Sequence, residues 1–128
     1  MAAPASRLQV IESYRGNAFR VSGMRHAGSV IVFRERTASW PVAAFDRIDI
    51  DALAGALAAA ESDPLAGRVE LLLLGCGARL IPPPPALRAR LKQIGVALEP
   101  MDTGAACLTY NVLAAEERRV AAALIAVA

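Results

Sequence analysis

The sequence predicts a single α/β domain, in which helices pack on a mixed β-sheet. Two observations predict this class. The run Val69–Leu74 (VELLLL) is almost entirely apolar, as expected of a strand that is buried on both faces. Apolar residues also recur at helical spacing on both sides of this run, in Ala52–Glu61 and in Ala86–Ile94. Strands that alternate with helices in this way build α/β layers.

Length and composition limit the chain to one domain, residues 1–128. The 128 residues are 55% hydrophobic and 20% charged, which is enough for one substantial core and too little for two. Residues 1–6 read as a loose N-terminal tail. The net charge of +2 is spread along the sequence, and no basic run is interleaved with aromatic residues. We therefore expect no nucleic-acid partner.

The N-terminal part of the chain reads as a hairpin region. Phe19 and Val21 alternate with polar residues, the period-two pattern of a half-buried strand that ends at Gly23. Ser29–Phe33 (SVIVF) is β-branched and apolar, so we expect a central strand that returns as the hairpin partner of the first. His26 then falls in the turn between them. Extended structure resumes at Trp40, a residue type that more often anchors a core edge than a binding site.

Two helices and two strands follow. Asp49 or Asp51 is placed to cap the helix over Ala52–Glu61. The stiff Pro82–Pro85 connector then supplies a proline at the first position of the helix over Ala86–Ile94. Gly95 ends that helix, and Val96 and Leu98 begin a strand. This strand and the Val69–Leu74 strand should be parallel neighbours in a right-handed βαβ unit.

The C-terminal part reads as helix. Asp102 or Thr103 is placed to cap a helix in which the apolar residues lie at helical spacing. A break near Ala114 and Ala115 would begin a second helix at the two following acids. The apolar stripe of this helical region extends to Leu124. Its members are Leu108, Val112, Leu113, Ala114, Ala115, Val120 and Leu124.

A glycine turn, Gly75-Cys76-Gly77, follows the most apolar strand. Ligands of α/β proteins bind at the carboxyl ends of such strands, but the spacing here fits neither a dinucleotide fingerprint nor a phosphate loop. A tight structural turn is the alternative. Small residues around Gly104 would likewise permit either close helix–sheet packing or an anion seat at the helix N-terminus, to which Arg79 would contribute.

The two cysteines, Cys76 and Cys107, are not spaced as zinc ligands or as a redox pair, and they suit a reducing compartment. Cys107 near a helix N-terminus would be a candidate nucleophile, but a base is also needed, and nothing in the sequence places the single histidine, His26, beside it. We therefore expect no cofactor, no metal site and no enzyme. No apolar stretch approaches the roughly 18 residues of a membrane span, so we expect a cytoplasmic protein.

The chain resembles the domain-of-unknown-function family that includes mitochondrial complex I assembly factor three and the adipogenesis-associated domain protein. The resemblance spans nearly all of the chain and is most specific in the segment from Met101 to Leu124. It implies a compact three-layer α/β fold and a non-catalytic assembly or interaction factor. Its partners would be proteins such as membrane-complex subunits, and it would lie peripheral to the inner membrane through them. One departure is Leu108, where family members often carry an arginine. The matching features are Tyr14, Gly16, Phe19, Gly28, Ser29, the Val30–Val32 strand, Trp40, Gly75, Cys76, Gly77, the Pro82–Pro85 block, Met101, Asp102, Thr103, Ala105, Ala106, Cys107, Thr109, Tyr110, Asn111, Val112, Leu113, Glu116, Arg118 and the run Val120–Leu124.

The candidate binding residues lie in two segments, the glycine turn and the start of the last helix. They either form a polar interaction surface, or they make capping and packing hydrogen bonds. A small-molecule or anion binding module at the same place is the alternative function. The oligomeric state stays open. The candidates are Gly75, Cys76, Gly77, Asp102, Thr103, Cys107, Tyr110 and Asn111.

Overall fold

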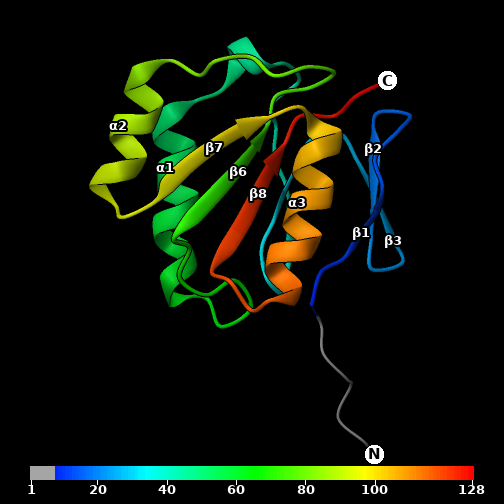
Figure 1. The fold of residues 1–128 in the computed structure, drawn as a ribbon, viewed down its shortest axis with the longest axis horizontal. Coiled ribbons are helices and arrows are strands. Elements are labelled where there is room, and N and C mark those ends of the chain that lie inside the picture. The colour runs from blue at the N-terminus through cyan, green and yellow to red at the C-terminus, as the bar shows by residue number, and fades with distance from the viewer. Residues whose placement is uncertain (1–7) are drawn as a thin grey trace, which may run out of the picture.

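The computed structural model describes residues 8–128, so the expected tail at residues 1–6 lies outside the described residues. The described chain contains a five-stranded sheet in the order β5-β4-β8-β6-β7 and a three-stranded sheet in the order β1-β2-β3 (Figure 1). The strands are β1 Ile11–Ser13, β2 Ala18–Val21, β3 Met24–Ala27, β4 Val30–Val32, β5 Thr37–Ser39, β6 Leu71–Gly75, β7 Ala97–Met101 and β8 Val120–Leu124. The helices are α1 Ile50–Ala59, α2 Pro85–Gln93 and α3 Thr103–Ala115, with short 3-10 turns η1 Phe45–Arg47 and η2 Ala60–Ser62.

The larger sheet separates two hydrophobic layers. Because side chains alternate along a strand, Leu72 and Leu74 of β6 face one layer and Leu73 faces the other. Helices α1 and α2 cover the first face, on which Leu53 and Leu87 are buried. Helix α3 and the three-stranded sheet together cover the second face (Figure 1). The predicted three-layer α/β fold with a mixed sheet is therefore confirmed.

The predicted βαβ unit is also present. Strands β6 and β7 are parallel neighbours, with Leu71 opposite Ala97, and α2 connects them. The signals for the helix ends are confirmed as well. The Asp49 carboxylate caps α1 by accepting from Ala52 N, Pro85 is the first residue of α2, and Gly95 follows α2 with a φ of 79°. Within residues 8–128, no helix combines the length and the apolar character that a membrane span requires.

The prediction of helix over residues 120–124 is wrong. Val120–Leu124 is strand β8, the middle strand of the larger sheet, and all five of its residues are buried. It pairs with β6 in parallel and with β4 in antiparallel orientation. Alanine favours a helix locally, but this segment gains main-chain partners on both sides in the sheet, so tertiary context overrides the local preference.

The predicted hairpin pairing is also wrong. The partner of β2 is β3, with Phe19 opposite His26, so His26 lies in a strand and not in a turn. The Ser29–Phe33 segment instead supplies β4 of the larger sheet, where Val30 lies opposite Leu124. Two glycines of positive φ, Gly23 and Gly28, allow the chain to turn twice within this region, which the alternating pattern alone did not reveal.

Candidate functional site

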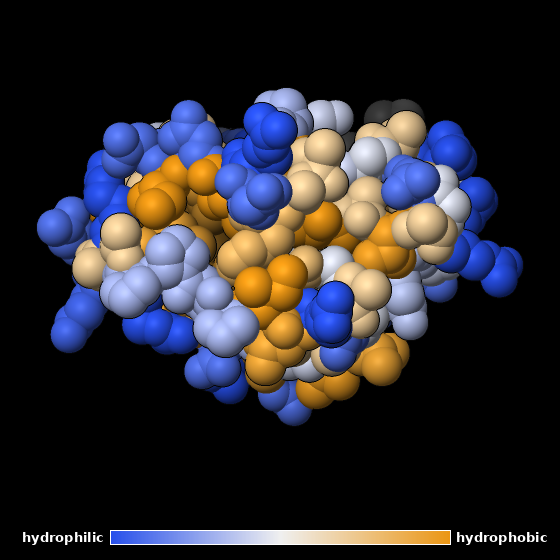
Figure 2. Space-filling model, turned by 90° about the horizontal axis from the view of Figure 1, so that it is seen from above, coloured by the Kyte–Doolittle hydropathy of each residue, from blue (hydrophilic) through white to orange (hydrophobic). Residues whose placement is uncertain are grey.

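The carboxyl ends of β6, β7 and β8 meet at the end of the molecule that is uppermost in Figure 1, where α3 begins. Seen from above, hydrophobic residues gather across the middle of this end and hydrophilic residues lie on both sides (Figure 2). The chain passes from β6 through α2 to β7 on one side, and then through α3 to β8 on the other side. Ligands of open α/β sheets bind at such a change of direction, so this end of the sheet is the first place to look for a site.

The junction between β6 and β8 is filled by Thr103, which is fully buried. Its hydroxyl group donates to Ile125 O at 2.8 Å and accepts from Gly77 N at 3.0 Å, while Thr103 N donates to Gly77 O at 2.8 Å. A Cβ atom on Gly75 would lie 3.0 Å from Thr103 Oγ1 and 3.1 Å from Thr103 Cα. Glycine at position 75 therefore permits the start of α3 to sit directly against the strand ends.

The N-terminus of α3 is capped from within the chain. The Asp102 carboxylate accepts from Ala105 N at 2.8 Å, as the sequence predicted. On the outer side, a Cβ atom on Gly104 would lie 2.8 Å from the hydroxyl oxygen of Tyr14, so the phenol ring lies closely against this glycine. The free N–H groups of this helix end are thus partly used by Asp102 and partly screened by Tyr14.

Both cysteines are free and buried. Burial raises the pKa of the Cys76 thiol, and burial together with the negative charge of Asp102 raises the pKa of Cys107 to about 12. At neutral pH both side chains are therefore protonated thiols, which are poor nucleophiles. In the described residues, His26 has no hydrogen bond to either cysteine, and no cluster of three metal-binding side chains is present.

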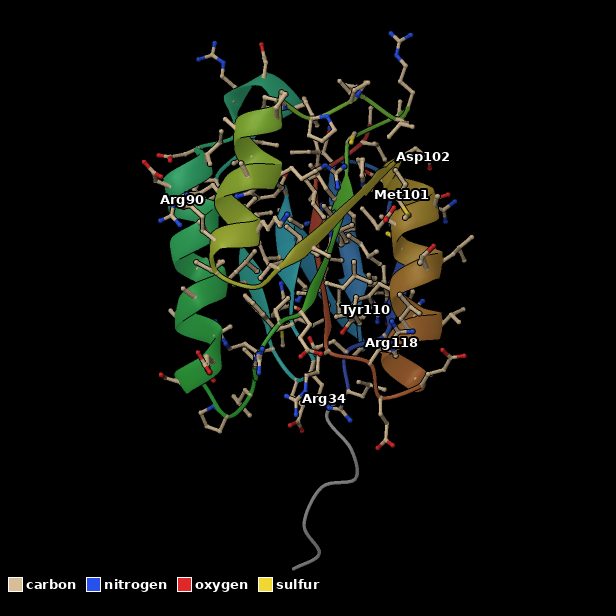
Figure 3. The ribbon with its side chains drawn as sticks, turned by 60° about the vertical axis from the view of Figure 1, so that its left-hand side comes forward. Arg34, Arg90, Met101, Asp102, Tyr110 and Arg118 are labelled. Carbon is tan, nitrogen blue, oxygen red and sulfur yellow. The ribbon has the colours of Figure 1, made fainter. Side chains whose placement is uncertain are left out.

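Tyr110 and Asn111 lie further along α3, and both bind main-chain groups. Tyr110 is fully buried, and its hydroxyl group donates to Phe33 O at 3.0 Å. Burial also raises the pKa of this phenol. The Asn111 amide accepts from Ile11 N and donates to Ile11 O, both at 2.9 Å. Figure 3 shows Tyr110 well away from Asp102, which lies at the start of α3.

The structure therefore brings five of the eight candidate residues together at the strand ends: Gly75, Cys76, Gly77, Asp102 and Thr103. Of the other three, Cys107 is buried within α3, and Tyr110 and Asn111 lie away from that place, bound to Phe33 O and to Ile11. The hydrogen bonds of Thr103, Tyr110 and Asn111 join α3 to the sheets, and that of Asp102 caps the helix. These are the capping and packing hydrogen bonds that the sequence offered as the alternative to a polar interaction surface.

Sequence reasoning missed an exposed apolar stripe on the outer face of α3. Leu108 is 69% exposed and Val112 is 57% exposed. Ala105 and Ala115 continue the stripe at spacings of three and four residues, the first half-buried and the second exposed. The helical periodicity grouped Leu108 and Val112 with Leu113 and Ala114 in one apolar stripe, without showing that these two residues are exposed. Small residues such as Ala106 and Ala114 face the sheet instead. The sequence signal for an exposed stripe was that apolar residues lie on both faces of this helix.

The family model described as protein of unknown function (DUF498/DUF598) matches residues 11–125. An uncharacterised protein of Rhodobacter capsulatus is 39% identical over 90% of this chain and 82% of its own length. NADH dehydrogenase [ubiquinone] 1 alpha subcomplex assembly factor 3 of Xenopus tropicalis is 31% identical over 94% of this chain, which spans only 63% of that relative.

Solved structures show the same fold. A Bordetella pertussis protein described as a Mth938-like domain has a TM-score of 0.79 and is 34% identical, over 98% of this chain and 90% of that one. A Bartonella henselae protein described as an outer membrane protein has a TM-score of 0.77 and is 31% identical, over 94% of this chain and 97% of that one.

Proposed function

Because the chain belongs to the DUF498/DUF598 family, and relatives of about 30% identity are named as NADH dehydrogenase assembly factors, we propose that it is a non-catalytic assembly or interaction factor. In this role it binds a protein subunit during the biogenesis of a respiratory or inner-membrane complex. It lies in the cytoplasm and reaches the membrane through this partner.

The exposed stripe of α3 is the observation that carries the proposal. Large apolar side chains such as Leu108 and Val112 side by side on one helix face are typical of protein interfaces. The spacing Ala105, Leu108, Val112, Ala115 alternates between three and four residues, the pattern by which one helix packs against another. The small alanines at both ends allow a close approach. The partner of this face is therefore an amphipathic helix of the target subunit.

The polar candidates contribute to this function indirectly. Thr103 and Tyr110 are fully buried, so they hold α3 in place and do not contact the partner. Asp102 and Asn111 are half-buried, and their side chains form hydrogen bonds of 2.8 and 2.9 Å with the chain's own main-chain groups. Helix α3 is thus a rigid platform, which lowers the entropy cost of binding on its outer face.

An anion or small-molecule site at the Gly75–Gly77 turn is less well supported. The donors that would hold an anion there are Gly77 N, Thr103 N and Ala105 N, and all three already have acceptors within the chain. A thiolate enzyme is disfavoured for a different reason, because the pKa of Cys107 is raised to about 12 by burial.

The proposal is tested by affinity capture from cells that encode the protein. A tagged Leu108→Glu, Val112→Glu double variant is compared with the wild type and with Leu80→Glu, a control that changes a 54% exposed leucine elsewhere. We expect wild type and control to capture subunits of NADH dehydrogenase or of another inner-membrane complex, and the double variant to lose them. Folding of all three is checked by circular dichroism.

A second readout is the amount of assembled complex on native gels after deletion of the gene. Wild type and Leu80→Glu should restore it, and the double variant should not. The proposal fails if the wild type captures no subunit of a membrane complex, or if all three forms capture and restore equally.

A further inference from the structure

A hollow of about 360 Å³ lies beyond the C-terminal end of α3, where the turn from α3 to β8 meets the chain just after β4. Figure 3 shows Arg34 and Arg118, which belong to its wall, well below Asp102 at the start of α3. Its volume falls in the range of small-molecule pockets, roughly 300–1,000 Å³. The residues that line this arginine hollow are Arg34, Ala66, Glu117, Arg118, Arg119 and Val120.

The wall of the arginine hollow carries a surplus of positive charge. Three of its lining residues are arginines, and among the described residues Glu117 is the one acid that lines it. Ala66 and Val120 are buried and add no charge. Guanidinium groups stay charged in proteins, and their N–H groups form a planar fork that matches the oxygens of an oxyanion. The wall therefore favours an anionic ligand.

Two of the three guanidinium groups are unused. In the part of the chain that the structure describes, the side chains of Arg118 and Arg119 form no ion pair and no hydrogen bond. Arg34 Nη2 lies 3.7 Å from Glu117 Oε1, and these two side chains are 42% and 81% exposed. Such an exposed pair is weak, because solvent screens it. The donors of the wall thus remain available to a ligand.

The main chain that carries these arginines is held in place. The hydrogen bonds at the end of α3 form a Schellman motif, in which Arg118 N donates to Leu113 O at 3.0 Å. Glu117 has a φ of 61° and occupies the position where this motif usually has glycine. Arg119 O then accepts from Glu70 N at 2.9 Å, which joins the turn to the chain that enters β6. A turn that is fixed before the ligand arrives lowers the entropy cost of binding.

We propose that the arginine hollow binds the phosphate group of a small soluble ligand. A phosphate monoester carries about two negative charges at neutral pH, which matches three positive charges against the single carboxylate of Glu117. Its oxygens can accept from several guanidinium groups at once, whereas a carboxylate offers one charge and two oxygens. The inference does not depend on the proposed assembly role.

The test uses sodium pyrophosphate as a soluble probe and follows the ¹H–¹⁵N spectrum of the protein at neutral pH. We expect the amide peaks of Arg34 and Arg118 to shift saturably, with a dissociation constant on the order of 1 mM. Sodium acetate should bind roughly tenfold more weakly, because it has fewer charges and acceptor oxygens. Constant ionic strength separates binding from salt screening.

A double variant locates the site. Arg118→Gln with Arg119→Gln removes the two unused guanidinium groups and should raise the dissociation constant roughly tenfold or more. The matched control is Arg15→Gln with Arg25→Gln, which removes the same charge beside a smaller hollow of about 180 Å³ on the three-stranded sheet. All four positions are exposed, and circular dichroism checks that both variants are folded. The control should bind pyrophosphate as the wild type does.

A change in the opposite direction gives a second readout. Glu117→Gln removes the competing carboxylate and should lower the dissociation constant roughly threefold, because an opposing charge near the phosphate is lost. Its control is Glu61→Gln, which changes an exposed acid outside the hollow and should leave the affinity unchanged.

Vesicles of phosphatidylcholine and phosphatidic acid present the same phosphate monoester on a lipid. We expect the protein to stay in solution when these vesicles are sedimented. Sedimentation of the wild type but not of the Arg118→Gln, Arg119→Gln variant would assign the hollow to lipid headgroups and overturn the proposal. It is also overturned if the pyrophosphate shifts do not saturate, or if the two double variants lose affinity equally.

Discussion

The side-chain amide of Asn111 forms both of its 2.9 Å hydrogen bonds with the main chain of Ile11, one hundred residues earlier in the sequence. The amide replaces the peptide group of a neighbouring strand, because it accepts from Ile11 N and donates to Ile11 O. This contact joins β1, and with it the three-stranded sheet, to α3. It makes the N-terminal sheet part of the layer that supports the outer face of the helix.

Replacement of Asn111 should therefore destabilise the whole domain. Asn111→Leu leaves both main-chain groups of Ile11 without partners, and we expect the free energy of unfolding to fall by about 1–3 kcal/mol. Asn111→Asp keeps the acceptor and should lose less. Urea denaturation measures the difference, and faster hydrogen exchange at Ile11 N should accompany it. An unchanged midpoint in Asn111→Leu would show that the contact contributes nothing.

Gly75→Ala should destabilise for a steric reason. The added Cβ would lie 3.0–3.1 Å from Thr103 Oγ1 and Cα, a tighter distance than most Cβ contacts show, so the buried start of α3 would have to shift to accept it. We expect a loss of about 1–3 kcal/mol. Gly55 is the matched control, since it lies within α1 with open space around its Cα. Gly55→Ala should stabilise by about 0.5–1 kcal/mol. Thermal unfolding of the two variants should shift in opposite directions, and equal shifts would contradict the steric argument.

The hydroxyl group of Thr103 should matter more than its shape. Thr103→Val has nearly the same volume but leaves Gly77 N without an acceptor and Ile125 O without a donor, so we expect a loss of about 1–3 kcal/mol. Thr103→Ser keeps the hydroxyl group, loses one methyl group, and should cost less. If valine were tolerated better than serine, packing and not hydrogen bonding would hold the strand ends together.

The stability of the protein should depend on alkaline pH through Cys107. Its pKa is raised from 9.0 to about 12 by burial, so the unfolded chain releases this proton at lower pH than the folded one. The stabilisation is complete below about pH 9 and is lost as the pH rises toward 12, by up to about 1.4 kcal/mol per unit. Chemical denaturation between pH 7 and pH 11 should show a shallower decline in Cys107→Ala. Equal slopes for the two proteins would exclude this linkage.

The two faces of α3 should respond differently to substitution. The Leu108→Glu, Val112→Glu variant changes exposed positions, so its free energy of unfolding should stay within about 0.5 kcal/mol of the wild type. Ala106 is fully buried against the sheet, and Ala106→Leu should cost about 1–3 kcal/mol by overpacking. Differential scanning calorimetry compares them. A large loss in the glutamate variant would mean that the stripe packs within the domain and is not free for a partner.

The sequence by itself determined most of the local structure. The caps of α1 and α3, the proline at the start of α2 and the Gly95 stop act within a few residues, so their side-chain chemistry is sufficient to predict them. The leucine run of β6 also predicted its own burial, because a strand with apolar residues on both faces needs a layer on each side. The family resemblance added the three-layer arrangement.

The tertiary structure alone decided which strands pair. Val120–Leu124 became the central strand because β4 and β6 supply hydrogen-bond partners that no local pattern reveals. The same holds for the candidate site. Residue type predicted that Asp102 and Asn111 would form hydrogen bonds, but not that Asn111 would bind Ile11 across the fold. Nor did residue type predict that Leu108 would be exposed to solvent. Long-range contacts fix these positions, since they depend on which elements fold against one another and not on the order of neighbouring residues.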